Sequence, residues 1–164
     1  MRSRIILGVV VVASVEVFAA CGSDNSTAAV QSTTYTSTMT AANEVRTPAV
    51  VSSATGSATY VLTGNLLTYT VSVNGLTGPV TASHIHAAPA GSNSGVIVPF
   101  VSAAVTSGTV TSGTIDLSQP ISNGTTSITG DSLRVLLNNG NAYTNVHTSL
   151  YGSGEIRGQI VKQP

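Results

Sequence analysis

Short runs rich in Val, Ile, Thr and Tyr, separated by turn residues, follow one another along most of the chain. They cover residues 34–40, 56–62, 66–73, 80–86, 96–100, 110–117, 142–147 and 155–161. β-Branched and aromatic residues of this kind fit strands, and Gly64-Asn65 between two runs indicates a tight hairpin. Many short strands at regular spacing predict an all-β sandwich or barrel.

One segment departs from the strand pattern. After Asp131, which we expect to be the N-cap, Leu133 and residues 135–137 follow at helical spacing, and Asn139-Gly140 provides a stop. The pattern predicts one short helix of about two turns on the β fold.

The amino-terminal segment reads as an export signal. Arg2 and Arg4 precede an apolar run over residues 5–15, and small residues lead to Ala19-Ala20-Cys21. Residues 18–21 resemble the lipobox of bacterial lipoproteins, in which the cysteine becomes the lipid-carrying first residue. We therefore expect a lipoprotein signal peptide over residues 1–20, lipidation of Cys21, and anchoring of the exported protein to a membrane of the cell envelope, periplasmic or at the cell surface.

Two alternatives to lipidation remain: a retained transmembrane anchor, for which the apolar run is short, and an ordinary signal peptide that removes or spares Cys21. Small polar residues dominate positions 21–34, and such a stretch buries too little surface to order itself, so we expect a flexible tether. The folded domain is expected over residues 35–164.

Composition narrows the possible partners. The chain has 164 residues, of which 41% are hydrophobic, so it is long enough for one domain with a core. Only 7% of the residues are charged and the formal net charge is zero. Because there is no basic run, we expect no nucleic-acid partner. A single cysteine excludes an internal disulfide, which agrees with lipidation.

Several motifs together resemble one known family, the CHRD domain, a module of secreted animal and bacterial exported proteins. They are Asn43-Glu44-Val45, Gly56-Ser57-Ala58, Leu67-Thr68-Tyr69, Asn74-Gly75-Leu76, His84-Ile85-His86, Asn93-Ser94-Gly95-Val96, Ser112-Gly113-Thr114-Ile115, Asn145-Val146-His147-Thr148 and residues 154–160. The resemblance runs from about residue 39 to 161. It implies an immunoglobulin-like β-sandwich or barrel outside the cytoplasm, and it leaves the biochemical activity open.

All three histidines of the chain fall in two of these motifs. Side chains alternate between the faces of a strand, so if Ile85 is buried, His84 and His86 point together to the other face, roughly 6.5 Å apart. The same alternation, with Val146 buried, places Tyr143, Asn145 and His147 on one face. In the last strand, with Ile156 and Ile160 buried, alternation places Glu155, Arg157 and Gln159 together on one face.

Two interpretations of this polar face remain open. In the first, His84, His86 and His147 bind a transition metal, copper or zinc, with Glu155 as a possible fourth ligand or neighbouring group. In the second, the histidines and a Glu155–Arg157 pair form a hydrogen-bonded network that ties three strands together. The ligand of such a non-catalytic module, a protein or a surface, is not identified by sequence.

Catalytic arrangements have less support. No Gly-x-Ser-x-Gly motif is present, and the carboxylates Glu44, Asp116, Asp131 and Glu155 are scattered along the sequence. We therefore expect a binding or structural module and no enzyme, with a metal-dependent enzyme as the remaining alternative.

Overall fold

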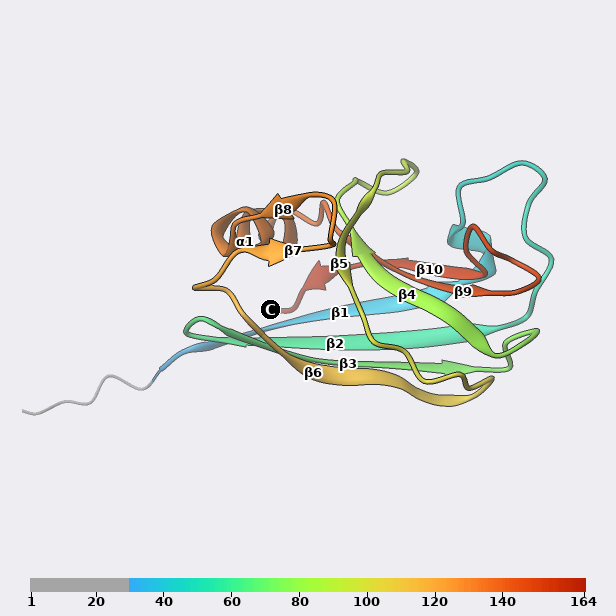
Figure 1. Ribbon diagram of the computed structural model, residues 1–164, viewed down its shortest axis with the longest axis horizontal. Helices are drawn as coiled ribbons and strands as arrows, with labels where there is room; N and C mark the ends of the chain where they lie inside the picture. The colour runs from blue at the N-terminus through green and yellow to red at the C-terminus, as the bar shows by residue number, and fades with distance from the viewer. Residues whose placement is uncertain (1–29) are drawn as a thin grey trace, which may run out of the picture.

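The strands predicted from sequence join into one antiparallel sheet in the computed structural model, which describes residues 30–164 (Figure 1). The order across this nine-stranded sheet is β5-β4-β9-β10-β1-β2-β3-β6, with β11 paired to β1; β7 and β8 form a separate hairpin. The elements are β1 (Ser32–Thr40), η1 (Ala41–Asn43), β2 (Thr55–Thr63), β3 (Leu66–Asn74), β4 (Val80–His86), β5 (Val96–Pro99), β6 (Gly108–Asp116), β7 (Ile121–Ser122), β8 (Ser127–Ile128), α1 (Gly130–Asn138), β9 (Tyr143–Thr148), β10 (Ile156–Gln159) and β11 (Val161–Lys162).

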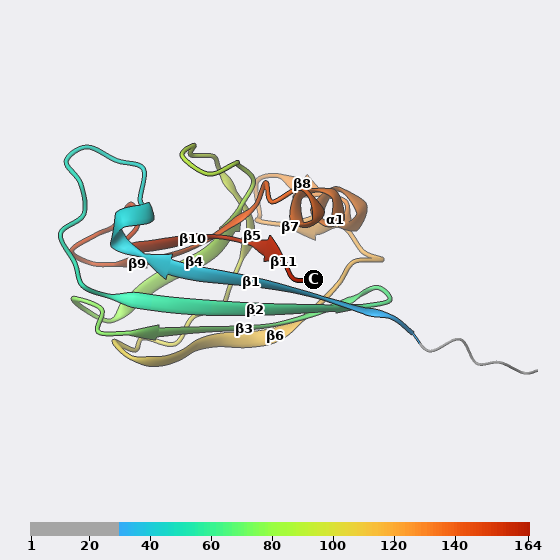
Figure 2. The ribbon, with the colours of Figure 1, turned by 180° about the vertical axis from the view of Figure 1, so that it is seen from behind.

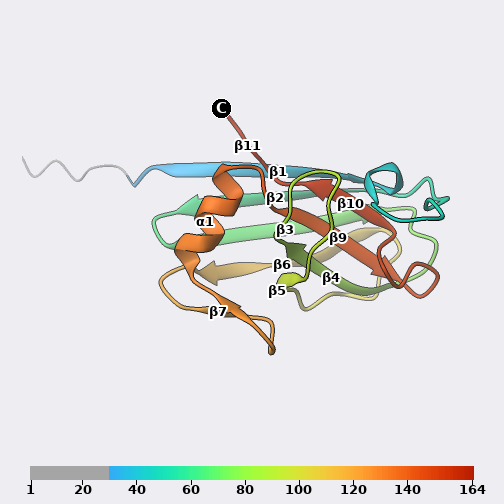
Figure 3. The same cartoon turned by 90° about the horizontal axis from the view of Figure 1, so that it is seen from above.

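The sheet curls so that its two halves face each other. Strands β1, β2, β3 and β6 form one layer, and β4, β9 and β10 cross over it, as the views from behind and from above show (Figures 2 and 3). Across the interior the Tyr60 hydroxyl lies 2.7 Å from Thr144 Oγ1, so β2 and β9 are joined by a buried hydrogen bond. The all-β fold with one short helix is thereby confirmed, with the sandwich built from a single continuous sheet.

The core lies between the two layers. Ile85, Val146, Ile156 and Ile160, the residues expected to point inward from β4, β9 and the last strands, are all 0% exposed. They belong to the same apolar cluster as buried side chains of β1 to β3, including Tyr60 and Leu67. Burial of this face leaves the opposite face of β4, β9 and β10 to the polar residues.

The helix α1 lies where it was expected, but its cap differs. Thr129 is the N-cap, and its Oγ1 accepts a hydrogen bond of 3.1 Å from the Ser132 amide. Asp131, predicted as the cap, instead lies in the first turn, where a carboxylate still favours the positive end of the helix dipole. Past the end of the helix, Gly140 adopts a φ of +66°, which glycine tolerates best.

The folded domain begins earlier than the predicted residue 35. Strand β1 begins at Ser32 and pairs with β2 from Ser32↔Thr63 onward, so three residues assigned to the tether belong to the sheet. The predicted signal peptide and the lipidated Cys21 lie outside the described residues. Within residues 30–164, no helix has the length and apolar character that a membrane crossing requires.

Candidate metal centre

The three histidines lie on neighbouring strands and on the same face. In the β4–β9 register, Ala82 pairs with His147, His84 with Asn145 and His86 with Tyr143. On the other side of β9, Arg157 pairs with Asn145 and Gln159 with Tyr143. The polar face predicted from strand alternation is therefore present across β4, β9 and β10, apart from Glu155.

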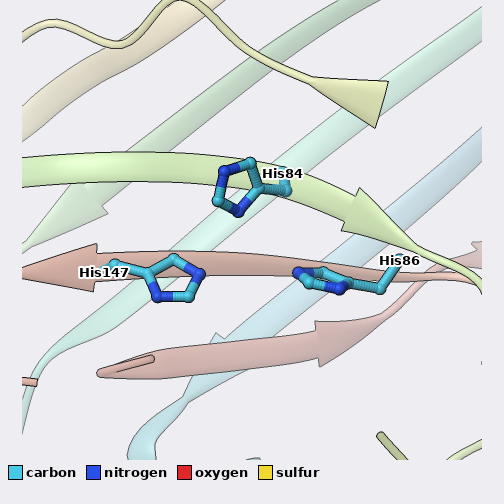
Figure 4. Close-up of side chains that lie close together, drawn as sticks. All are labelled: His84, His86 and His147. Carbon is cyan, nitrogen blue, oxygen red and sulfur yellow. The ribbon is translucent and has the colours of Figure 1, made fainter. Parts of the chain in front are cut away.

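The imidazole rings converge on one point (Figure 4). Each ring offers one nitrogen, and these three atoms all lie within 4.8 Å of one another. The ring centroid of His84 is 5.6 Å from that of His86 and 5.0 Å from that of His147. Three strand positions separated by up to 63 residues thus form one cluster.

Hydrogen bonds to the other ring nitrogens fix the tautomers of two histidines. His86 Nδ1 lies 3.0 Å from the Ser94 carbonyl oxygen, and His147 Nδ1 lies 3.1 Å from that of Gly152. Because a carbonyl oxygen only accepts, each Nδ1 carries the proton and each Nε2 keeps a free lone pair. An imidazole held by a carbonyl at one nitrogen and free at the other has the arrangement found around protein-bound metals.

The converging nitrogens have no protein partner. His84 Nδ1, His86 Nε2 and His147 Nε2 are buried side-chain nitrogens with no hydrogen bond within the described part of the chain. Buried polar atoms are nearly always paired, so three unpaired nitrogens at one point require an explanation. A metal ion that accepts all three lone pairs is one.

Burial also keeps these rings neutral. It lowers the pKa of all three histidines, and for His84 the neighbouring His147 and His86 add to the effect and bring the pKa to about 4. The carbonyls at His86 and His147 partly offset this lowering of the pKa. Neutral imidazole is the form that binds metals.

Tyr143 and Arg157 support the ring of His86. The Tyr143 ring is stacked on His86 with centroids 4.6 Å apart and planes 3° apart, and Arg157 Cζ lies 3.4 Å from the Tyr143 centroid. The Arg157 guanidinium is held by Asn93 Oδ1 at 2.9 Å and by the Ser92 carbonyl at 2.7 Å. The same loop supplies the Ser94 carbonyl to His86, so loop, arginine and tyrosine together fix this ring.

Glu155 does not join the histidines. Its oxygens accept hydrogen bonds from the Thr77 amide (2.9 Å), Thr77 Oγ1 (2.7 Å), Thr148 Oγ1 (2.7 Å) and Ser52 Oγ (2.7 Å). Strand alternation fails here because β10 begins only at Ile156 and Gly154 before it has a φ of +124°. The prediction of a Glu155–Arg157 pair is also wrong, since Arg157 bonds to the loop and Glu155 bonds to three hydroxyls and the Thr77 amide.

The carboxylate near the histidines is Glu44 instead. Its Oε1 accepts a 2.5 Å hydrogen bond from Asn145 Nδ2, and Asn145 of β9 pairs with His84 and lies two residues before His147. A side chain at position 154 would place a Cβ 2.6 Å from Glu44 Oε1, so glycine there leaves room for the carboxylate. Glu44 belongs to the Asn43-Glu44-Val45 motif, which was the available sequence signal for it.

A pocket of about 250 Å³ opens beside the cluster. His86 and His147 form part of its wall, and the remaining lining residues are Glu44, Val45, Arg46, Asn93, Ser94, Tyr143, Asn145 and Ser153. Two of the three clustered histidines therefore line this pocket, and His84 does not. Three imidazoles form a ligand set that suits zinc or copper.

Metal binding requires a modest contraction of the cluster. A tetrahedral ion with bonds of about 2.0–2.1 Å places its nitrogens roughly 3.3 Å apart, whereas the separations here extend to 4.8 Å. The three ring nitrogens must therefore move closer together when an ion binds.

Comparison with known families identifies one match. The family model described as the CHRD domain matches residues 35–160, which include every strand from β2 to β10 and all three histidines. Comparisons with curated proteins and with solved structures find no match.

Proposed function

The chain belongs to the CHRD domain family, and from this premise and the histidine geometry we propose that it binds one copper or zinc ion through His84, His86 and His147. The observation that carries the proposal is the convergence of three buried, unpaired ring nitrogens from two strands. We assign the site a binding role and no catalytic step.

A purely structural role for the histidines has less support. A hydrogen-bonded network would leave its buried nitrogens paired, because an unpaired buried polar atom costs about 1–3 kcal/mol. Here the groups that do form paired networks are Glu155 with its three side-chain neighbours and Arg157 with its loop. The inward-facing nitrogens of the histidines are left out of both.

We further propose that the protein is an exported lipoprotein, tethered to an envelope membrane through Cys21. The support is the amino-terminal pattern of basic residues, apolar run and Ala19-Ala20-Cys21. A metal-binding module held at a membrane surface would meet metal ions outside the cytoplasm. The protein or surface partner of the module is not assigned.

Isothermal titration calorimetry of the metal-free protein with zinc, and with copper in a buffer of known affinity, tests metal binding. We expect one ion per chain, and the single variants His84→Ala, His86→Ala and His147→Ala should each weaken binding at least tenfold. Gln119→Ala, an exposed position outside the site, is the control. Circular dichroism should show that all variants keep their β fold.

His147→Ala gives the sharpest distinction. A site made by His84 and His86 alone would survive the loss of His147, whereas a three-histidine site would weaken strongly. No heat of binding with either metal in the wild type, or wild-type affinity retained in all three variants, would overturn the proposal.

A further inference from the structure

The pocket beside the histidines contains two opposite charges that do not pair with each other. Glu44 and Arg46 both line it, and no direct ion pair joins them within the described residues, although Arg157 and Arg46 both lie close enough to attract the Glu44 carboxylate. Glu44 is partly buried and Arg46 is exposed. A pocket lined by two of the proposed metal ligands, a carboxylate and a guanidinium has the elements needed to hold a small molecule with one amine and one carboxylate.

Glu44 retains a free acceptor. Its Oε1 is bonded to Asn145 Nδ2, while Oε2 has no hydrogen-bond donor among residues 30–164. Asn145 Nδ2 also donates to the Ile156 carbonyl at 3.0 Å, so the amide is fixed and holds the carboxylate in place. The free oxygen therefore suits an N–H donor on a ligand that enters the pocket.

Arg46 retains free donors. Its Cζ lies 5.9 Å from the Tyr151 ring centre, a contact that leaves the N–H groups unused, and the described chain offers it no hydrogen-bond acceptor. A guanidinium matches a carboxylate with two parallel hydrogen bonds. The volume of about 250 Å³ is below the usual range for drug-sized ligands, so the occupant must be small.

We propose that this pocket binds a small amino carboxylate, an α-amino acid, as a fourth ligand of the metal. The proposal rests on the metal site proposed above. The ligand's ammonium group would lose one proton to solvent, and the resulting amine would complete the coordination of an ion held by the three histidines. An N–H of the amine then donates to Glu44 Oε2, and the carboxylate pairs with Arg46.

Equilibrium dialysis of zinc-loaded protein against radiolabelled glycine tests this inference, with zinc content measured in the same samples. Glycine should be retained by the zinc-loaded protein and not by the metal-free protein, and it should bind more tightly than acetate or methylamine. Arg46→Met should weaken glycine binding at least tenfold with unchanged zinc content. Arg134→Met, which removes a guanidinium bonded to the Gly64 carbonyl and Asn65 instead, should leave it unchanged.

The outcomes separate the two proposals. If zinc is retained but glycine is not, or if glycine removes zinc as a soluble complex, the amino-acid pocket is wrong and the metal site stands. If acetate binds as tightly as glycine, the amine has no role and the proposed ligand class is wrong. If zinc is not retained even without glycine, the metal site fails and this inference fails with it.

Discussion

The buried carboxylate of Glu155 should be one of the largest polar contributors to the stability of this fold. Its side chain is 0% exposed and accepts four hydrogen bonds, from Thr77 twice, Thr148 and Ser52. At about 1 kcal/mol for each bond, Glu155→Ala should lower the free energy of unfolding by about 4 kcal/mol. Glu155→Gln keeps the shape and two of the bonds, while the threonine hydroxyls can turn to accept, so we expect a loss of about 1–2 kcal/mol.

The pH dependence of the difference in unfolding free energy between wild type and Glu155→Gln shows whether the ionised carboxylate causes it. Burial acts to raise the pKa of Glu155, but hydrogen bonds from Thr148, Ser52 and Thr77 outweigh it and hold the pKa below the ordinary 4.5. The folded state therefore binds this proton less readily than the unfolded state, and the stabilisation is present above about pH 4.5 and lost as pH falls through the lower, folded pKa. The difference in unfolding free energy between wild type and Glu155→Gln should shrink below pH 4.5.

Urea unfolding at a series of pH values, followed by circular dichroism, measures both effects. Asp116→Asn is the matched control, because Asp116 is exposed and its carboxylate bonds only to the neighbouring Ser118, so its loss should cost less than about 0.5 kcal/mol. A loss below 1 kcal/mol for Glu155→Ala would refute the argument. So would a difference between wild type and Glu155→Gln that does not change with pH.

Three further predictions concern the core, the histidines and the tether. Ile85→Ala and Ile156→Ala should each cost about 2–5 kcal/mol in denaturant unfolding, whereas Val135→Ala, at a position 58% exposed, should cost little. In the metal-free protein, the pKa values of the three histidines are lowered, so as pH falls the unfolded state binds protons before the folded state does. Stability should therefore fall as pH drops from about 6.5 toward the pKa of about 4 of His84, in unfolding curves measured with a chelator. Cys21→Ser should release the protein from the membrane fraction or block its processing, as fractionation and mass spectrometry would show.

Each of these has a clear contrary result. Losses under about 0.5 kcal/mol at both Ile85 and Ile156 would mean that the faces of β4 and β10 are assigned incorrectly. A triple histidine-to-glutamine variant with the same stability profile between pH 6.5 and 4 would show that other groups cause the pH dependence. Membrane-bound Cys21→Ser of unchanged mass would exclude lipidation.

Strand alternation predicted the histidine cluster from sequence because it depends only on local backbone geometry. Once Ile85 and Val146 are inside, His84, His86 and His147 must share the other face. The register that brings His147 beside His84 is not local, but β4 and β9 each carry one short apolar pattern that allows few pairings.

The remaining parts of the site depend on contacts that local patterns do not encode. Glu155 follows Gly154 with a positive φ, which turns the side chain away from the face that alternation assigned to it. Glu44 reaches the site across 101 residues through Asn145, and no periodicity links the two. The β7–β8 hairpin has only two residues in each strand, too few for an alternating pattern to stand out.

The number of imidazoles on a bound metal is the most direct measure of the central claim. The extended X-ray absorption fine structure (EXAFS) of the zinc-loaded protein should show three imidazole ligands at about 2.0–2.1 Å and one further nitrogen or oxygen ligand. The imidazole contribution should fall to two in His147→Ala if that variant still holds zinc. A wild-type spectrum with two or fewer imidazoles, or with sulfur in the first shell, would contradict a site built from His84, His86 and His147.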